Sequence, residues 1–302
     1  MDSGETYHIP VLLDESVDGL NITPEGIYLD LTYGGGGHSK EILSRLKKGK
    51  LIGFDQDTEA EGNIINDDRF IFAKSDFRYL KNFLRYYKIS KVDGVLADLG
   101  ISSHQIDTAN RGFSFRSDAR IDMRMNTSSD FSASDILSKY SVKELIRIFR
   151  EYGEINNAKK LAEIIVSHRK NNDIINTQQL VELIKPIAPE RILNKYMAKV
   201  FQALRYEVTG EIESLKIMLL QLDGLLKKGG RVSIISYNSI EDKLVKNIFK
   251  YGLLTGEADK DIYGNYSVPY TQLNKRVIIP DVEELARNPR SRSAKLRIAE
   301  KK

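Results

Sequence analysis

Tyr28-Leu29-Asp30-Leu31-Thr32-Tyr33-Gly34-Gly35-Gly36-Gly37-His38-Ser39 is the most informative stretch of the 302-residue sequence. A short apolar run ends in a carboxylate, four glycines follow, and apolar residues at helical spacing (Ile42, Leu43, Leu46) begin directly after them. This order predicts a strand, a glycine-rich turn and a helix, the first crossover of a dinucleotide-binding-like α/β unit. Glycines let the backbone adopt positive φ and approach a ligand closely, and the N-terminus of the next helix attracts an anionic group.

The glycine pattern is incomplete as a nucleotide fingerprint. From Gly34 the spacing is G-x-G-x-x-S, so the third glycine is missing, and no G-K-[ST] follows to make a P-loop. A flexible glycine turn without a ligand is therefore an alternative interpretation of this stretch.

A second apolar run, Leu51–Phe54, ends at Asp55, twenty-one residues after Gly34. A carboxylate at this distance, at the end of the second strand, is placed to accept hydrogen bonds from ribose hydroxyls. Asp57 competes for this role, but it precedes Thr58-Glu59-Ala60 and is typical of a helix N-cap. A 2′-phosphate would be repelled here, which leaves NAD or another adenosine cofactor such as S-adenosylmethionine.

Composition narrows the function classes. Apolar residues make up 41% of the chain, enough for a large core, and no run approaches the roughly 18–20 apolar residues of a membrane span. The polar, acidic start (residues 1–6) matches neither a signal nor a transit peptide, so we expect a cytoplasmic protein. The sequence gives no oligomeric state.

The chain has no cysteine, which excludes disulfides, thiolate zinc sites and thiol nucleophiles. Its four histidines (His8, His38, His104, His168) are far apart in sequence, and neither G-x-S-x-G nor H-E-x-x-H occurs, so we expect no metal site. The net charge is +4, but residues 275–302 alone carry nine Lys/Arg against four Asp/Glu. Such a basic tail is either a phosphate-binding surface or a solvated end segment.

Strand-like and helix-like runs alternate up to residue 98 and predict a parallel sheet with right-handed crossovers. The expected strands are Ile27–Leu31, Leu51–Phe54, Phe70–Ala73 and Val92–Ala97, with helices near 38–48, 58–66 and 77–88. Between 107 and 205 the pattern is helical throughout, at 134–139, 142–151, 158–169, 177–185 and 195–206. A long helix (211–226) then ends at Gly229-Gly230, and a strand resumes at 231–236. We therefore predict an α/β domain of residues 1–106 and 206–302, interrupted by a helical domain of residues 107–205.

The fourth strand ends at Asp98, where parallel strands deliver side chains to the ligand-binding edge of the sheet. A carboxylate that only caps the next turn is the alternative. The following segment, residues 110–125, has no regular period and holds two phenylalanines (Phe113, Phe115) among four arginines. Arginine and aromatic faces together bind phosphates and unpaired bases, but Phe113, Phe115 and Met123 are equally typical of core that joins the two domains.

Seven motifs along the chain resemble one family, the bacterial ribosomal small-subunit methyltransferase H family, also called MraW. They are T-x-G-x-G-G-H (32–38), G-x-D (53–55), D-L-G-[IV]-S-S (98–103), R-G-F-S-F (111–115), D-M-R-M (122–125), F-Q-A-L-R (201–205) and N-P-R-[SA]-R-S (288–293). The resemblance runs nearly end to end in the same order.

The resemblance implies a class I, Rossmann-like S-adenosylmethionine-dependent methyltransferase with an inserted helical substrate-recognition domain. It implies methylation of N4 of a cytosine in the decoding region of 16S ribosomal RNA, within the small ribosomal subunit. The implied cofactor contacts are Gly36, Gly37, His38, Asp55, Phe77, Asp98 and Gln105. The chain departs from the family at His104 and at Asp118–Ile121, where the usual residues are Pro and D-G-P-L. It departs again in the run Ser236-Tyr237-Asn238-Ser239-Ile240-Glu241-Asp242, where the usual sequence is S-F-H-S-L-E-D, so that Tyr237 replaces Phe and Asn238 replaces His.

Asp98 is our candidate catalytic residue, with a nearby backbone carbonyl as the alternative, because a hydrogen-bond acceptor beside the cytosine amine would raise the electron density of the amine nitrogen. The target base must also leave its stack. A non-catalytic RNA-binding assembly factor and an NAD-dependent dehydrogenase are the rival functions, although the latter would lack an evident His/Arg catalytic pair.

Overall fold

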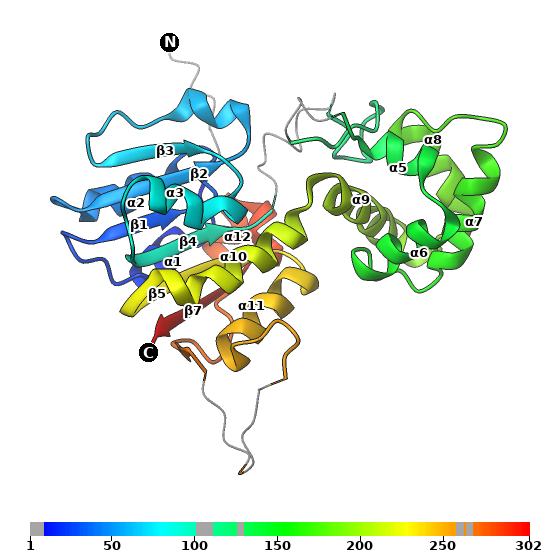
Figure 1. Ribbon diagram of the computed structural model, residues 1–302. Coiled ribbons are helices and arrows are strands. Elements are labelled where there is room, and N and C mark those ends of the chain that lie inside the picture. The colour runs from blue at the N-terminus through cyan, green and yellow to red at the C-terminus, as the bar shows by residue number, and fades with distance from the viewer. Residues whose placement is uncertain (1–8, 101–110, 126–129, 258–262, 264–267) are drawn as a thin grey trace. The chain divides into compact units, whose positions relative to one another are not determined.

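The computed structural model describes residues 9–100, 111–125, 130–257, 263 and 268–302. The chain divides into two compact units, one of Met1–Gly100 with Ile212–Lys302 and one of Ile101–Glu211. We call them the α/β unit and the helical unit (Figure 1).

A seven-stranded sheet organises the α/β unit, in the order β3-β2-β1-β4-β5-β7-β6 (Figure 1). Its strands are β1 (Ile27–Asp30), β2 (Lys50–Asp55), β3 (Phe70–Lys74), β4 (Val92–Asp98), β5 (Leu226–Ser236), β6 (Tyr270–Gln272) and β7 (Lys295–Lys301). The first five are parallel, and β7 runs antiparallel to both β5 and β6. The predicted α/β fold with a parallel sheet is confirmed.

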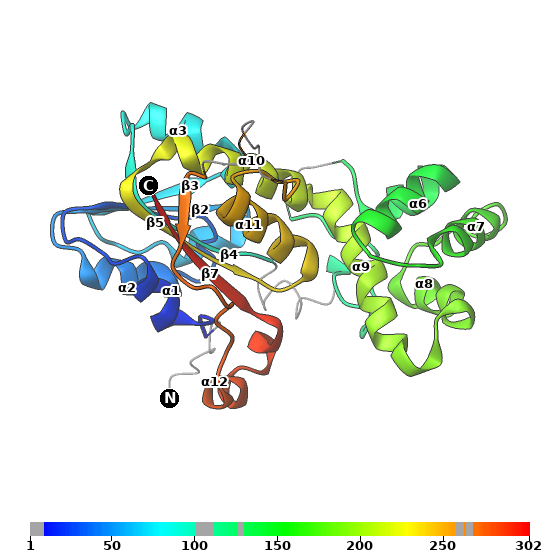
Figure 2. The same cartoon turned by 90° about the horizontal axis from the view of Figure 1, so that it is seen from below.

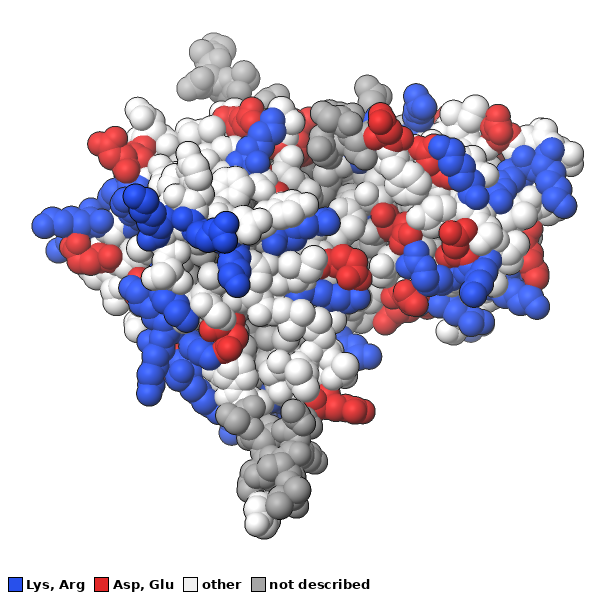
Figure 3. Space-filling view, viewed as in Figure 1, with Lys and Arg blue, Asp and Glu red and all other residues white. Residues whose placement is uncertain are grey.

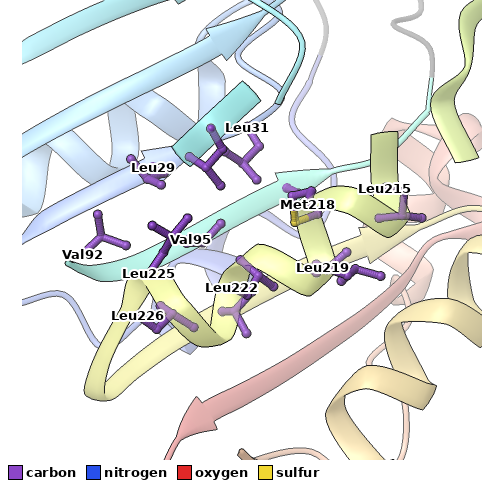
Figure 4. Packing of buried hydrophobic residues seen from close by; sticks show 14 of the residues in the cluster. Leu29, Leu31, Val92, Val95, Leu215, Met218, Leu219, Leu222, Leu225 and Leu226 are labelled. Atoms are coloured by element: carbon purple, nitrogen blue, oxygen red, sulfur yellow. The ribbon is translucent and has the colours of Figure 1, made fainter. Parts of the chain in front are cut away.

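Helices cover both faces of this sheet (Figure 2). Apolar side chains of α1 (Leu13–Gly19) and α2 (Gly37–Arg45) share one buried cluster. Those of α3 (Leu80–Tyr86), α10 (Glu211–Leu225) and α11 (Ser239–Tyr251) share another. In the second cluster Leu215, Leu219 and Leu222 of α10 pack towards Leu29 and Val95 of the central strands (Figure 4). Because the centre of the sheet is apolar and buried, the polar residues that could bind a ligand lie at the strand ends.

Two sequence predictions for this unit were wrong. The expected helix at 58–66 is a 3-10 segment, η1 (Thr58–Asn63). The strand expected at 231–236 begins at Leu226, directly after α10, so that Gly229 and Gly230 lie inside β5, where Gly229 has φ of 77° beside a register shift against β4.

The basic C-terminal segment is not a tail. It forms α12 (Val282–Arg287), the 3-10 segment η6 (Pro289–Ser293) and β7 inside the sheet. Arg297 pairs with Asp242 at 2.7 Å, and Glu300 pairs with Arg231 at 2.9 Å. These charges were misread because the sequence does not show which of them meet a partner from a distant segment.

The helical unit has its own apolar core, formed by α5 (Ala133–Lys139), α6 (Val142–Glu151), α7 (Ala158–His168), α8 (Thr177–Ile184) and α9 (Leu193–Thr209). Its limits lie six residues outside the predicted 107 and 205. At the C-terminal side the reason is that α9 continues unbroken to Thr209, and Gly210, with φ of 66°, ends it in the left-handed conformation.

The arginine-rich segment divides between core and surface. Phe113 and Met123 are buried in the core of the helical unit, and Phe115 packs against it. Arg111 donates to the carbonyls of residues 124 and 125. Arg116 and Arg120 are exposed. The aromatic residues of this segment therefore serve the fold, and only part of its charge faces solvent.

Candidate functional site

Three carboxylates end three neighbouring strands of the α/β unit. Asp30 ends β1, Asp55 ends β2 and Asp98 ends β4, and β1 lies between the other two strands. Because all three strands are parallel, their carboxyl ends meet at one edge of the sheet, where open α/β folds bind ligands.

The glycine turn leads from β1 into α2 at this same edge. Gly34 and Gly36 have φ of 50° and 75°, which only glycine adopts without strain. The first backbone bond of α2 runs from Lys40 N to Gly36 O at 2.8 Å. The N–H groups of residues 37–39 therefore precede the helical ladder and are available to a ligand.

Ser39 stands where the dinucleotide fingerprint has its third glycine, and its side chain holds Asp30. Its hydroxyl donates to Asp30 Oδ2 at 2.7 Å, and Thr32 N donates to Asp30 Oδ1 at 3.1 Å. Asp30 is only 1% exposed. Sequence reasoning noted this carboxylate but did not place it in the site, although its position at a strand end matches those of Asp55 and Asp98.

Two backbone N–H groups, one of them in the glycine turn, hold the Asp55 carboxylate. Gly34 N donates to Asp55 Oδ2 and Asp57 N donates to Asp55 Oδ1, each at 2.8 Å. The side chain is partly exposed, so its remaining lone pairs can accept further hydrogens. Asp57 accepts from Glu59 N and is the N-cap of η1, as predicted.

Asp98 meets residues that sequence reasoning missed. Tyr237, which directly follows β5, donates its hydroxyl proton to Asp98 Oδ1 at 2.7 Å. Asp98 N donates to Thr32 Oγ1 at 2.7 Å, so Thr32 links the end of β4 to the glycine turn. Glu241, near the start of α11, is buried within electrostatic range of Asp98. The position of Tyr237 at a strand end was the available signal.

Three predicted cofactor contacts remain: His38, Phe77 and Gln105. The His38 side chain is buried and its Nε2 lies 3.1 Å from Val11 O, so only its backbone faces the turn. Burial lowers the pKa of His38, and the nearby Asp98 opposes this. Phe77 opens η2 (Phe77–Tyr79) after β3 and packs partly buried against the core. Gln105 lies outside the described residues.

Burial raises the pKa of each strand-end carboxyl, that of Asp30, Asp55 and Asp98, to about 6. Mutual repulsion adds to this, since Asp30 faces both of the others. Above pH 6 the edge therefore carries a concentration of negative charge. Such a site favours a cationic ligand and opposes the diphosphate of a dinucleotide, which carries two negative charges.

Within the ranges that the structure describes, no three His, Cys, Asp or Glu side chains are grouped so as to hold a metal ion. No helix in that part of the chain is long and apolar enough to cross a membrane.

Comparison with known proteins decides the family. The model of the MraW methylase family matches residues 5–302. The chain belongs to this family. It is 54% identical to "Ribosomal RNA small subunit methyltransferase H" of Bacteroides fragilis and of Bacteroides thetaiotaomicron, in each case over 298 residues that cover 98% of both chains. Among solved structures, an rRNA methylase from Streptococcus thermophilus is 12% identical over 97% of this chain and 98% of its own, with a TM-score of 0.44.

Membership confirms the predicted enzyme class, a S-adenosylmethionine-dependent methyltransferase with the class I α/β fold. The residues present fit this cofactor. Its sulfonium and ammonium groups suit the carboxylate edge, and its ribose hydroxyls suit the partly exposed Asp55. The dehydrogenase alternative is thereby set aside.

Replacing Asp55 with alanine should weaken S-adenosylmethionine binding by roughly 1.5–3 kcal/mol, the scale of hydrogen bonds to a charged acceptor. Titration calorimetry measures this. Asp57→Ala is the matched control, because Asp57 caps η1 and should leave affinity unchanged. A folded Asp55→Ala protein with wild-type affinity would place the ribose elsewhere.

Cofactor affinity should also depend on pH. The three carboxyls ionise at about pH 6, so attraction for a cation is present above that pH and is lost as the pH falls through it. If binding requires the charge of one of these carboxylates, S-adenosylmethionine should bind about tenfold more weakly at pH 5 than at pH 7.5, because about one-tenth of that carboxyl is ionised at pH 5.

S-adenosylhomocysteine, whose sulfur is neutral, is the matched ligand for this test and should lose less affinity over the same range. Equal losses for the two compounds would show that the carboxylates do not act on the sulfonium charge.

Proposed function

We propose that the chain methylates N4 of a cytosine in the decoding region of 16S ribosomal RNA, with the small ribosomal subunit as substrate, in the cytoplasm. The relatives named as ribosomal RNA small-subunit methyltransferases support the substrate. The observation that carries the chemistry is the partly exposed carboxylate of Asp98 at the cofactor edge of the sheet.

A cytosine amine is a poor nucleophile, because its lone pair is conjugated with the ring. Asp98 would accept a hydrogen bond from this amine, raise its electron density and hold it in line for attack. S-adenosylmethionine, held by the backbone of Gly36, Gly37 and His38 and by Asp55, would supply an electrophilic methyl group. Phe77 and Gln105 complete the proposed cofactor contacts. Since the pKa of Asp98 is about 6, the carboxylate is ionised at neutral pH.

Composition supports nitrogen as the acceptor atom. Methylation of carbon 5 of a pyrimidine proceeds through a cysteine thiolate, and the chain has no cysteine. A ribose 2′-hydroxyl needs a base, often lysine, and residues 98–105 include none. The exocyclic nitrogen already has a lone pair and needs neither.

We propose that the helical unit recognises the RNA. Arg116 and Arg120 are exposed, and no ion pair joins either one to another described residue. Arg116 follows Phe115, which packs against the core of this unit, and Arg120 precedes the buried Ile121, so the backbone at both positions is held while the exposed guanidinium groups can meet phosphates. Lysines and arginines lie among carboxylates over this unit (Figure 3), which favours binding by a few placed cations over a uniformly basic surface.

Small subunits isolated from cells without the enzyme, treated with it and labelled cofactor, should release N4-methylcytidine on nuclease digestion. Label found as 5-methylcytidine would refute the argument from composition. RNA binding with no label transferred would favour the rival function, a non-catalytic assembly factor.

Arg116→Glu combined with Arg120→Glu should weaken RNA binding and lower the slope of log affinity against log salt by about 1.5, the contribution of two phosphate contacts. The matched control is the double change of Lys243 and Lys246, exposed on α11 of the other unit, to glutamate. The control should keep the wild-type slope. Equal effects of the two double changes would contradict the proposal that the helical unit recognises the RNA.

A further inference from the structure

Tyr237 reaches the candidate catalytic carboxylate from a distant part of the sequence. It is the residue after β5, whose Ile235 is paired with Asp98 in the sheet register. Leu99 N donates to Ile235 O at 2.9 Å, which fixes the end of β4 against the end of β5. The bond of 2.7 Å between the Tyr237 hydroxyl and Asp98 Oδ1 thus joins two strand ends that the sheet already holds in place.

The tyrosine itself is well anchored. Its backbone N–H donates to Glu241 Oε2 at 3.1 Å, and the next residue, Asn238, caps α11 by accepting from Ile240 N and Glu241 N. The ring packs against the buried cluster that contains Ile235, and Gly100 lies close to it. The packing of the ring and the helix that follows therefore hold the hydroxyl in place.

Within the described part of the chain, Tyr237 alone donates a hydrogen bond to the Asp98 carboxylate, and it does so to Oδ1. No described residue donates to Oδ2. A hydrogen bond to one oxygen restricts rotation of the carboxylate about its Cβ–Cγ bond, so it also limits the directions in which the second oxygen presents its lone pairs.

We propose that Tyr237, which stands where the family usually has phenylalanine, is a positioning residue particular to this chain: its hydroxyl holds Asp98 Oδ1 so that Oδ2 accepts a hydrogen bond from the amine of the target base. This inference rests on the role proposed above for Asp98. The tyrosine touches neither cofactor nor base and acts through the carboxylate.

The surroundings of Asp98 give this hydrogen bond a second effect. His38 of α2 faces the carboxylate and favours its charged form, while Asp30 of β1 and Glu241 of α11 repel it. The Tyr237 hydroxyl lowers the pKa of Asp98 against that repulsion. Burial, the Asp98 carboxylate and Glu241 raise the pKa of Tyr237 well above its usual value, so the phenol stays a donor at neutral pH.

Tyr237→Phe tests the inference, since it removes one oxygen and keeps the ring. The matched control is Tyr28→Phe, which removes another buried tyrosine hydroxyl of the same unit, one that accepts from Thr23 N at 2.8 Å and has no contact with Asp98. Equal thermal unfolding of the two variants would show that any difference between them is local.

The first readout is the carboxyl ¹³C resonance of Asp98 in aspartate-labelled protein, assigned by its loss in Asp98→Asn. We expect its titration midpoint to rise by about one pH unit in Tyr237→Phe and to stay in place in Tyr28→Phe. An unchanged midpoint in Tyr237→Phe would overturn the inference. This readout needs no RNA, so it stands even if no N4-methylcytidine is formed and the proposed function fails.

The second readout is the pH profile of kcat on small subunits. In Tyr237→Phe the acid limb should move to higher pH by the same amount, kcat at neutral pH should fall about tenfold, and the affinity for S-adenosylhomocysteine should change less than twofold. A shifted carboxyl midpoint with a wild-type kcat profile would show that the hydrogen bond is structural and would overturn the catalytic assignment.

Discussion

The convergence of parallel strand ends is the constraint on which the site depends. The strands β2, β1 and β4 lie side by side and point the same way, so each one that ends in a carboxylate delivers it to the same edge. The apolar helices on both faces keep water away from the sheet, and the resulting desolvation raises the pKa of all three carboxyls, including those of the partly exposed Asp55 and Asp98. The fold thus sets both the position and the acidity of the groups that meet the cofactor.

Hydrogen bonds from backbone N–H groups and from hydroxyls stabilise the three neighbouring carboxylates. Asp30 accepts from Ser39 and Thr32, Asp55 from Gly34 and Asp57, and Asp98 from Tyr237. Each donor comes from the turn or helix start that follows the same strand or a neighbouring one. The glycine turn therefore has two functions, since it frees N–H groups for a ligand and also satisfies the carboxylates beside it.

The charge of the site separates two cofactors that the sequence pattern leaves open. A glycine turn and an acidic residue about twenty positions later are common to dinucleotide and S-adenosylmethionine sites. Asp30 and Asp98 flank the turn with negative charge, which repels a diphosphate and attracts a sulfonium. This electrostatic distinction agrees with the family to which the chain belongs.

By itself the sequence determined the strand-turn-helix order, the position of Asp55 after the glycine turn, the helical character of residues 134–206 and the absence of thiol chemistry, because these depend on local spacing and composition. Only the tertiary structure decided that the basic C-terminal segment ends in a strand of the sheet, that Phe113 and Met123 are core, and that Tyr237 meets Asp98 across 139 residues of chain. The physical reason is that a side chain's partner depends on strand order and register, and these follow from packing between distant segments. A short antiparallel strand such as β6, or a hydroxyl aimed at a distant carboxylate, leaves no periodic trace in the sequence.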